Sequence, residues 1–236
     1  MDKKQAKVAL DKIVKQIFGV DNPLTLEQAV KKFTFDISLP RKVKDSTDNS
    51  ETWTAYPTDT IRFMKMANAR ANDASPSKGL YAAQPIKDLR DILNKWSGIN
   101  AITAEFALDS ENIAESDMVE KSENVFHSRD IFRSKDVYYS DNIIDSEFIF
   151  ASQSSTEVTF CMRAQDSNQS ANCFGITRSG GLTNCFMMHD CGDMQDSMFC
   201  SNMSGYRFCI ANMQFEEAEY RRLQKQVIEW ILSPAS

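Results

Sequence analysis

Two groups of side chains in this sequence could carry chemistry. The first is Cys185, His189 and Cys191, which lie within seven residues, beside Asp190 and Asp193. Thiolate, imidazole and carboxylate groups are the ligands that zinc takes in proteins. The group has no Cys-x-x-Cys pair, however, and its spacing matches no standard zinc module. We therefore favour a structural role for the thiols, keep the three residues as weak metal candidates, and expect no metal and no other cofactor.

The second group surrounds His127, which lies directly before Ser128 in a repeat of period six. Acyltransferases built from hexapeptide repeats share this period and commonly use a histidine base beside the acceptor hydroxyl. Their small residue follows the aliphatic residue by four positions, whereas the offset here is three. We expect His127 to occupy a corner of the repeat, and an acyltransferase stays open as the enzymatic alternative.

The remaining sequence features exclude several other function classes. The motifs G-x-S-x-G, G-x-G-x-x-G and G-x-x-x-x-G-K-[ST] are all missing. A net charge of −6 and a pI near 5.1 argue against nucleic-acid binding, which needs a basic surface. No apolar run is long enough for a membrane helix, and the N-terminus lacks the apolar core of a secretory signal, so we expect neither a membrane span nor export by that route.

The element that must position these side chains is a repeat in the middle of the chain. Every sixth residue is a serine: Ser110, Ser116, Ser122, Ser128, Ser134, Ser140, Ser146 and Ser152. Three residues after each of the first seven comes a β-branched aliphatic: Ile113, Val119, Val125, Ile131, Val137, Ile143 and Ile149. A six-residue unit with one β-branched residue predicts a solenoid of short strands and tight corners, in which like residues stack.

The coil could hold two six-residue sides or three. Cys161, Cys173 and Cys185 are twelve residues apart and stack directly only in a twelve-residue coil, which we favour over one of eighteen. We expect these cysteines to continue the serine ladder. Asn or Asp one residue before the aliphatic suits a corner, where its side chain can bond the backbone. These corner residues are Asn112, Asn124, Asp130, Asp136 and Asn142.

Aromatic residues often follow the aliphatic position, and they predict a ladder either inside the coil or along one outer face. They are Phe126, Phe132, Tyr138 and Phe150.

Helical and irregular segments flank the repeat. We predict helices over 3–18, 25–33, 85–96 and 215–232, a strand over 35–39, and loops over 41–54 and 67–78. Helix 85–96 has a continuous apolar face, for which we favour packing in a local core over a docking surface. The fold class is α+β: a helical N-terminal anchoring region with extended arms over 1–100, a β-solenoid over 101–214 and a helix over 215–236 that covers the open solenoid end.

Part of the chain resembles a cysteine-dotted repeat family found in candidate-phyla bacteria and in tailed phages. The residues that carry the resemblance are Asn172-Cys173-Phe174-Gly175-Ile176 and the run from Arg207 to Tyr220, and it covers about residues 110–232. Many members carry a CaiB/BaiF label, which implies CoA transfer, but this sequence has no resemblance to that fold or its catalytic carboxylate. In this chain serine replaces most cysteines of the first half. The resemblance implies a β-solenoid and, in phage members, a virion component.

These observations favour a non-catalytic structural component of a large assembly, most plausibly a phage virion or capsid-associated protein. A bacterial cytosolic scaffold is the alternative among structural roles. We expect the partners to be other protein subunits that bind the N-terminal helices and arms, with no nucleic acid, membrane or small-molecule substrate. The location would be the virion if a phage encodes the chain, and otherwise the cytoplasm.

Overall fold

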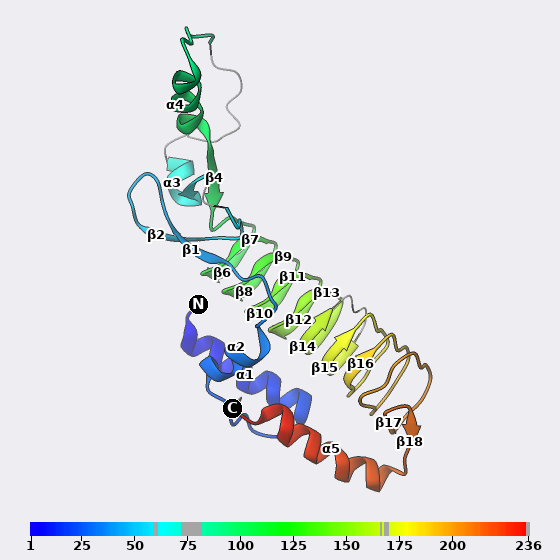
Figure 1. Ribbon diagram of the computed structural model, residues 1–236. Coiled ribbons are helices and arrows are strands. Elements are labelled where there is room, and N and C mark those ends of the chain that lie inside the picture. The colour runs from blue at the N-terminus through cyan, green and yellow to red at the C-terminus, as the bar shows by residue number, and fades with distance from the viewer. Residues whose placement is uncertain (59–60, 72–81, 166, 168–169, 235–236) are drawn as a thin grey trace.

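A computed structural model describes residues 1–58, 61–71, 82–165, 167 and 170–234. Its middle is a β-solenoid, with helices along one side and a smaller module beyond its first coil (Figure 1). Helices at the N-terminus, a solenoid in the middle and a helix at the C-terminus confirm the predicted α+β class. The predicted loop over 67–78 is partly wrong, because Met66–Ala71 forms helix α3; positions 72–78 lie outside the described residues.

Each coil of the solenoid contains twelve residues, as the cysteine spacing predicted. Parallel pairing joins Val125 to Val137 and Val137 to Ile149, each step being twelve residues. The coil therefore has two sides, and each side contributes a strand to one of two sheets. Beyond the last regular strands, isolated bridges such as Phe186 to Met198 and Met198 to Ile210 continue the same register.

The two sheets contain seven and five strands. The seven-stranded sheet consists of β6 (Glu111–Ala114), β8 (Glu123–Phe126), β10 (Lys135–Tyr138), β12 (Glu147–Phe150), β14 (Val158–Gln165), β15 (Ser170–Thr177) and β16 (Phe186–His189). The five-stranded sheet consists of β5 (Ala107–Leu108), β7 (Asp117–Glu120), β9 (Arg129–Phe132), β11 (Asp141–Ile144) and β13 (Gln153–Thr156). The predicted aliphatic residues from Val119 to Ile149 are buried between the sheets.

The corners of the coil are residues with positive φ, and over most of the solenoid they recur every third residue. The predicted corner residues Asn112, Asn124, Asp130, Asp136 and Asn142 all have φ between 54° and 57°, which confirms their role. Asn and Asp tolerate this left-handed conformation better than other non-glycine residues, because their short polar side chains bond locally. The corner side chain of Asn124 bonds to the next coil and not to the backbone: its Nδ2 donates to Asp136 Oδ1 at 2.9 Å.

The ladder serines form a column of hydrogen-bonded side chains inside the solenoid, which we call the serine file. Ser140 Oγ donates to the carbonyl oxygen of Tyr138 at 2.8 Å and accepts the backbone N–H of Ser152, one coil further on, at 3.1 Å. The same two bonds recur at the four preceding ladder serines: Ser116, Ser122, Ser128 and Ser134. Each buried hydroxyl is thus satisfied and also satisfies a buried backbone donor.

The cysteines occupy a different file from the one predicted. Cys161 pairs with Ile149 and Cys173 with Cys161, so these thiols extend the aliphatic file and not the serine file. Larger residues take over the serine file in the same coils, among them Val158 and Leu182, which are buried. A close-packed interior of constant cross-section needs a constant volume per coil, so small and large residues have exchanged places.

A second core lies on the outer face of the seven-stranded sheet. Three helices cover this face: α1 (Lys3–Phe18), α2 (Leu26–Phe33) and α5 (Glu217–Leu232). The side chains beneath them include Phe126, Tyr138, Phe150, Met162, Phe174 and Phe186. The predicted aromatic ladder is therefore on an outer face, although Phe132 belongs to β9 in the other sheet. Burial of large aromatic faces is the main stabilisation that these helices gain.

Helix α5 covers the flank of the solenoid and not its open end, as Figure 1 shows. Its buried residues Tyr220, Ile231 and Leu232 belong to the second core. The last coil is closed differently, by the short hairpin of β17 (Cys209–Ile210) and β18 (Met213–Gln214). Asn212 in its turn accepts the N–H of Ser201 and donates to its carbonyl, both at 2.9 Å, and so satisfies an edge that would otherwise be unpaired.

A small module stands before the first coil. It contains the hairpin of β1 (Arg41–Lys44) and β2 (Glu51–Thr54), the parallel pair of β3 (Arg62–Lys65) and β4 (Ala101–Ala104), and helices α3 and α4 (Leu89–Ile99). The hairpin contradicts the predicted loop over 41–54, and no strand forms at 35–39. Both hairpin strands are largely polar and partly exposed, so they lack the apolar alternation that marks a strand.

One buried aspartate joins this module to the solenoid, and a second holds the module's own hairpin. Asp117, on the first coils, accepts the N–H groups of Ala55 and Phe106, both at 2.8 Å. Burial raises the pKa of this carboxyl, and the backbone donors oppose the shift. Asp45 holds the hairpin in the same way, since it accepts from the backbone of Thr47 and Lys65, and its pKa is lowered to about 2. The junction is built from charge-assisted bonds to the backbone.

Candidate functional site

The three weak metal candidates do not converge. The side chains of Cys185 and Cys191 are buried in the solenoid core, whereas His189 is exposed on the outer surface. The His189 imidazole lies 3.0 Å from the guanidinium of Arg178. The backbone turns at a residue of positive φ every third position here, so the side chains that point into the core recur every third residue, at Leu182, Cys185, Met188 and Cys191, and His189 points outward. Among the residues that the structure describes, no group of histidine, cysteine and acidic side chains could hold a metal ion.

His127 occupies a corner with φ of 49°, in agreement with the sequence interpretation. Its Nδ1 lies 3.1 Å from Glu115 Oε2 of the preceding coil, and its ring packs against Trp53 and Tyr139. Burial lowers the pKa of the imidazole, while the Glu115 carboxylate opposes the shift. These groups line a pocket of about 340 Å³ that also includes Lys31 of α2.

This pocket contains an oriented imidazole but no activated nucleophile from the serine ladder. A carboxylate that holds one ring nitrogen leaves the other free to accept a proton, as general bases do. The neighbouring Ser128 is fully buried, donates to the carbonyl of Phe126 and accepts the N–H of Ser140. Its hydroxyl is therefore buried and hydrogen-bonded within the solenoid, where it cannot react with a ligand. Trp53 and Tyr139 could not be assigned to this pocket from sequence, since they come from separate elements.

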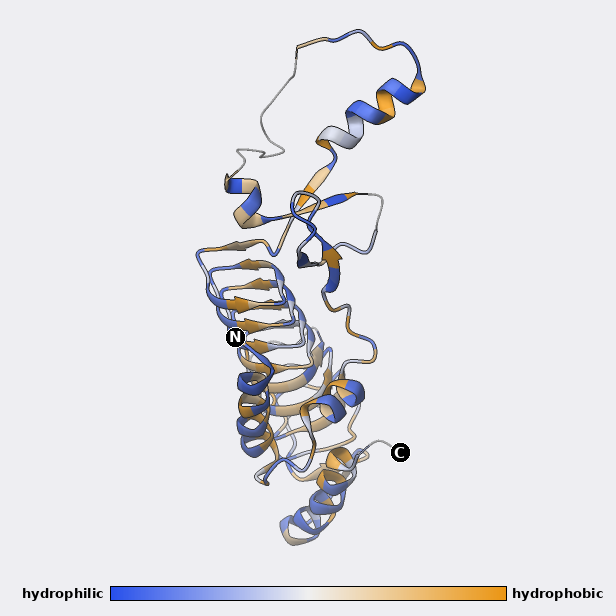
Figure 2. Cartoon of the chain, turned by 90° about the vertical axis from the view of Figure 1, so that its left-hand side faces the viewer, coloured by the Kyte–Doolittle hydropathy of each residue, from blue (hydrophilic) through white to orange (hydrophobic). Residues whose placement is uncertain are grey.

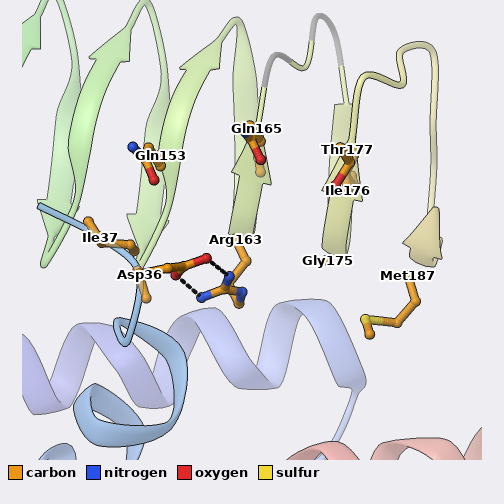
Figure 3. Close-up of a pocket in the computed structure, with 11 residues that line it drawn as sticks. Asp36, Ile37, Gln153, Arg163, Gln165, Gly175, Ile176, Thr177 and Met187 are labelled. Carbon is orange, nitrogen blue, oxygen red and sulfur yellow. Dashed lines mark hydrogen bonds and ion pairs between the residues drawn. The ribbon is translucent and has the colours of Figure 1, made fainter. Parts of the chain in front are cut away.

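A second pocket, of about 220 Å³, lies where the segment after α2 crosses the solenoid (Figure 3). Arg163 donates to both carboxylate oxygens of Asp36, at 2.8 and 2.6 Å, and to the carbonyl of Phe33 at 2.6 Å. These bonds lower the pKa of Asp36. Figure 3 shows Gln153 and Gln165 above this ion pair on neighbouring coils. The Arg163 guanidinium thus joins the segment after α2 to the solenoid. Sequence spacing gave no sign of the Asp36–Arg163 pair.

Helix α4 is the feature that departs most from its expected environment. It lies beyond the first coil, apart from both cores (Figures 1 and 2), and none of its residues is buried. The predicted apolar face is exposed, so the favoured interpretation of a local core is wrong. The side chains predicted to form this face are between 48% and 67% exposed: Ile86, which precedes the helix, Leu89, Ile92, Leu93 and Trp96. Ile99, the last residue of the helix, adds a further apolar side chain that is 54% exposed. An exposed apolar face of this size is the feature by which interaction surfaces are recognised, which makes α4 a candidate site.

The ends of α4 show that the helix itself is well specified. Asp88 is its N-cap and accepts the N–H of Asp91 at 3.0 Å, so the helix begins at Leu89, four residues later than the predicted start at 85. It continues three residues past the predicted end at 96 and ends at Ile99. An isolated helix of this length is marginal in water, because most helical stability in proteins comes from packing. The apolar face therefore supplies stability only when something covers it.

Comparison with known proteins gives no relative for this chain: no family model, no curated protein and no solved structure matches it. In the described part of the chain, every helix is too short or too polar to cross a membrane. The site with the clearest physical signature is therefore the exposed apolar face of α4.

Proposed function

We propose that this protein is a non-catalytic structural component of a large assembly, to which it is fastened by helix α4. The setting that the family resemblance implies is the virion of a tailed phage, in which the chain would be a minor capsid or decoration protein. A bacterial cytosolic scaffold would use the same helix in the same way.

The body of the molecule suits this role because it is bonded along its whole length. Backbone hydrogen bonds and the serine files connect each coil to the next, and the helices fasten the outer face through a second core. A solenoid whose last coil is closed by a hairpin and whose flank is covered by helices leaves few exposed strand edges from which unfolding could begin. The first coil is joined to the α4 module through the Asp117 bonds.

The observation that carries the proposal is the unpartnered apolar face of α4. Five large apolar side chains, each about half exposed, lie on a helix that touches neither core, and Ile86 just before the helix is similarly exposed. Helices α1 and α2 bury their apolar residues against the solenoid. Within the N-terminal helices and arms from which subunit contacts are expected, this favours α4 as the element that binds the partner.

The proposal is tested by fractionating the native assembly from cells that produce the full chain. We expect the protein to sediment with particles of megadalton mass at a fixed ratio to a second subunit. Leu93→Asp, on the α4 face, should release it into the soluble fraction. The matched control is Val8→Asp, which changes an exposed apolar residue on α1 and should leave the protein with the particles.

The enzymatic alternative makes an opposite prediction for the His127 pocket. Calorimetric titration of the full chain with acetyl-CoA should give no saturable heat. Saturable binding that His127→Ala abolishes would contradict a non-catalytic role, because His127 lines this pocket.

A further inference from the structure

The apolar face of α4 has the composition of a surface that pairs with itself. We infer that α4 docks against α4 of a second copy of this chain, in an antiparallel arrangement with two-fold symmetry. The inference rests on the proposed function in one respect, namely that α4 is the docking element. It adds that the subunit which α4 binds is a second copy of this chain.

The area of the face suits a partner of equal length and equal polarity. Five large side chains on α4 that are each about half exposed present on the order of 550 Å² of apolar surface. Two such faces together would bury about 1,100 Å², just above the roughly 1,000 Å² that a specific interface needs. A smaller or more polar partner would leave part of the face in water, so the pairing needs a second face like this one.

Charged side chains at the border of the stripe are complementary when the helix meets itself. With 3.6 residues per turn, Asp88 and Lys95 lie two turns apart on one border, and Arg90 and Ser97 lie on the other. In an antiparallel pair each border faces its own copy, so Asp88 of one helix meets Lys95 of the other, twice by symmetry. Asp88 and Lys95 each make one side-chain bond in the single chain, to Asp91 N and Gln84 Oε1, which leaves capacity for a second.

Two further features favour the antiparallel direction over the parallel one. Antiparallel pairing about the midpoint of Ile92 and Leu93 places Trp96 opposite Leu89, whereas parallel pairing places Trp96 against Trp96. The solenoid follows the C-terminal end of α4 through β4 (Figure 1), so antiparallel helices hold the two bodies at opposite ends. Each chain has a net charge of −6, and this separation reduces their repulsion.

The first experiment is sedimentation of the full chain over a wide concentration range. We expect a reversible monomer–dimer equilibrium that Leu93→Asp shifts toward monomer by at least tenfold, while Val8→Asp leaves it unchanged. Lys95→Glu should weaken the dimer several-fold, because it opposes Asp88, and adding Asp88→Asn should restore most of the loss. Asparagine also caps a helix, so the second change leaves α4 intact.

The second experiment fixes the direction of the helices by oxidative cross-linking. A mixture of Leu89→Cys chains and Trp96→Cys chains should form disulfide-linked dimers, whereas Leu89→Cys alone should not. The two Leu89 positions would lie about 10 Å apart along the axis of an antiparallel pair. Cross-linking of Leu89→Cys with itself would overturn the antiparallel arrangement.

The outcomes separate this inference from the proposed function. If the chain stays monomeric at all concentrations but Leu93→Asp still releases it from native particles, the inference is wrong and the assembly role stands. Open-ended association beyond the dimer also overturns it, because α4 would then dock elsewhere on the next copy. If the chain forms a dimer that the variants weaken and restore as predicted, but never joins a larger particle, the inference is supported and the assembly role is refuted.

Discussion

Removing a single ladder hydroxyl tests the account of the solenoid interior. In Ser140→Ala the carbonyl of Tyr138 keeps a donor, because Ala151 N–H also bonds it at 3.0 Å. The N–H of Ser152 loses its acceptor and stays buried. A buried donor left unsatisfied costs about 1–3 kcal/mol, so we expect that loss in the free energy of unfolding.

Ser110→Ala is the matched control, since Ser110 makes the same two bonds, to Leu108 O and from Ser122 N. It lies in the first coil and is partly exposed, so water can replace the hydroxyl and the loss should stay below about 1 kcal/mol. Denaturant unfolding gives both values, and hydrogen exchange should show faster exchange at the Ser152 amide in Ser140→Ala. Equal losses in the two variants, or unchanged exchange at Ser152, would refute the ladder as a stabilising element.

Three further predictions concern the thiols, the second core and the Asp36–Arg163 pair. All six cysteines are buried, and burial raises the pKa of Cys161 to about 12, so a thiol reagent at pH 8 should label them only after unfolding. Tyr220 is buried with no bond to its hydroxyl, so Tyr220→Phe should leave the unfolding free energy equal or up to about 1 kcal/mol higher; a loss would reveal a partner. Arg163 lowers the pKa of Asp36 in the folded chain, so this pair stabilises above the pKa of the unfolded carboxyl and loses that effect as pH falls through the folded pKa. The difference in unfolding midpoint between the native chain and Asp36→Asn should therefore be largest near pH 7 and vanish toward pH 2; a constant difference would contradict the assignment.

The repeat made the solenoid predictable to the level of individual corners. A period of six with the twelve-residue cysteine spacing gave the coil length, and Asn or Asp before the aliphatic residue gave corner positions such as Asn124 and Asp136. The file of the cysteines was misassigned because the serine and aliphatic files both point inward, three residues apart. A small residue fits either file when its neighbour compensates, so residue size alone does not fix the phase.

The N-terminal region was less predictable because its structure depends on tertiary contacts. The β1–β2 hairpin is held by Asp45 and by pairing between polar strands, neither of which leaves an apolar pattern. The face of α4 was visible in the sequence, but periodicity shows only that a helix has an apolar side and not what covers it. Likewise, the Asp36–Arg163 pair joins residues 127 positions apart, which no local signal indicates.

Hydrogen exchange at α4 tests the docking role most directly. In the isolated chain at high dilution, the amides of Leu89–Ile99 should exchange close to the rate of an unfolded peptide, because no residue of the helix is buried. In the native assembly the same amides should be strongly protected, while those of the solenoid strands are protected in both states. Protection of α4 in the dilute chain, or rapid exchange at α4 within the assembly, would contradict the account.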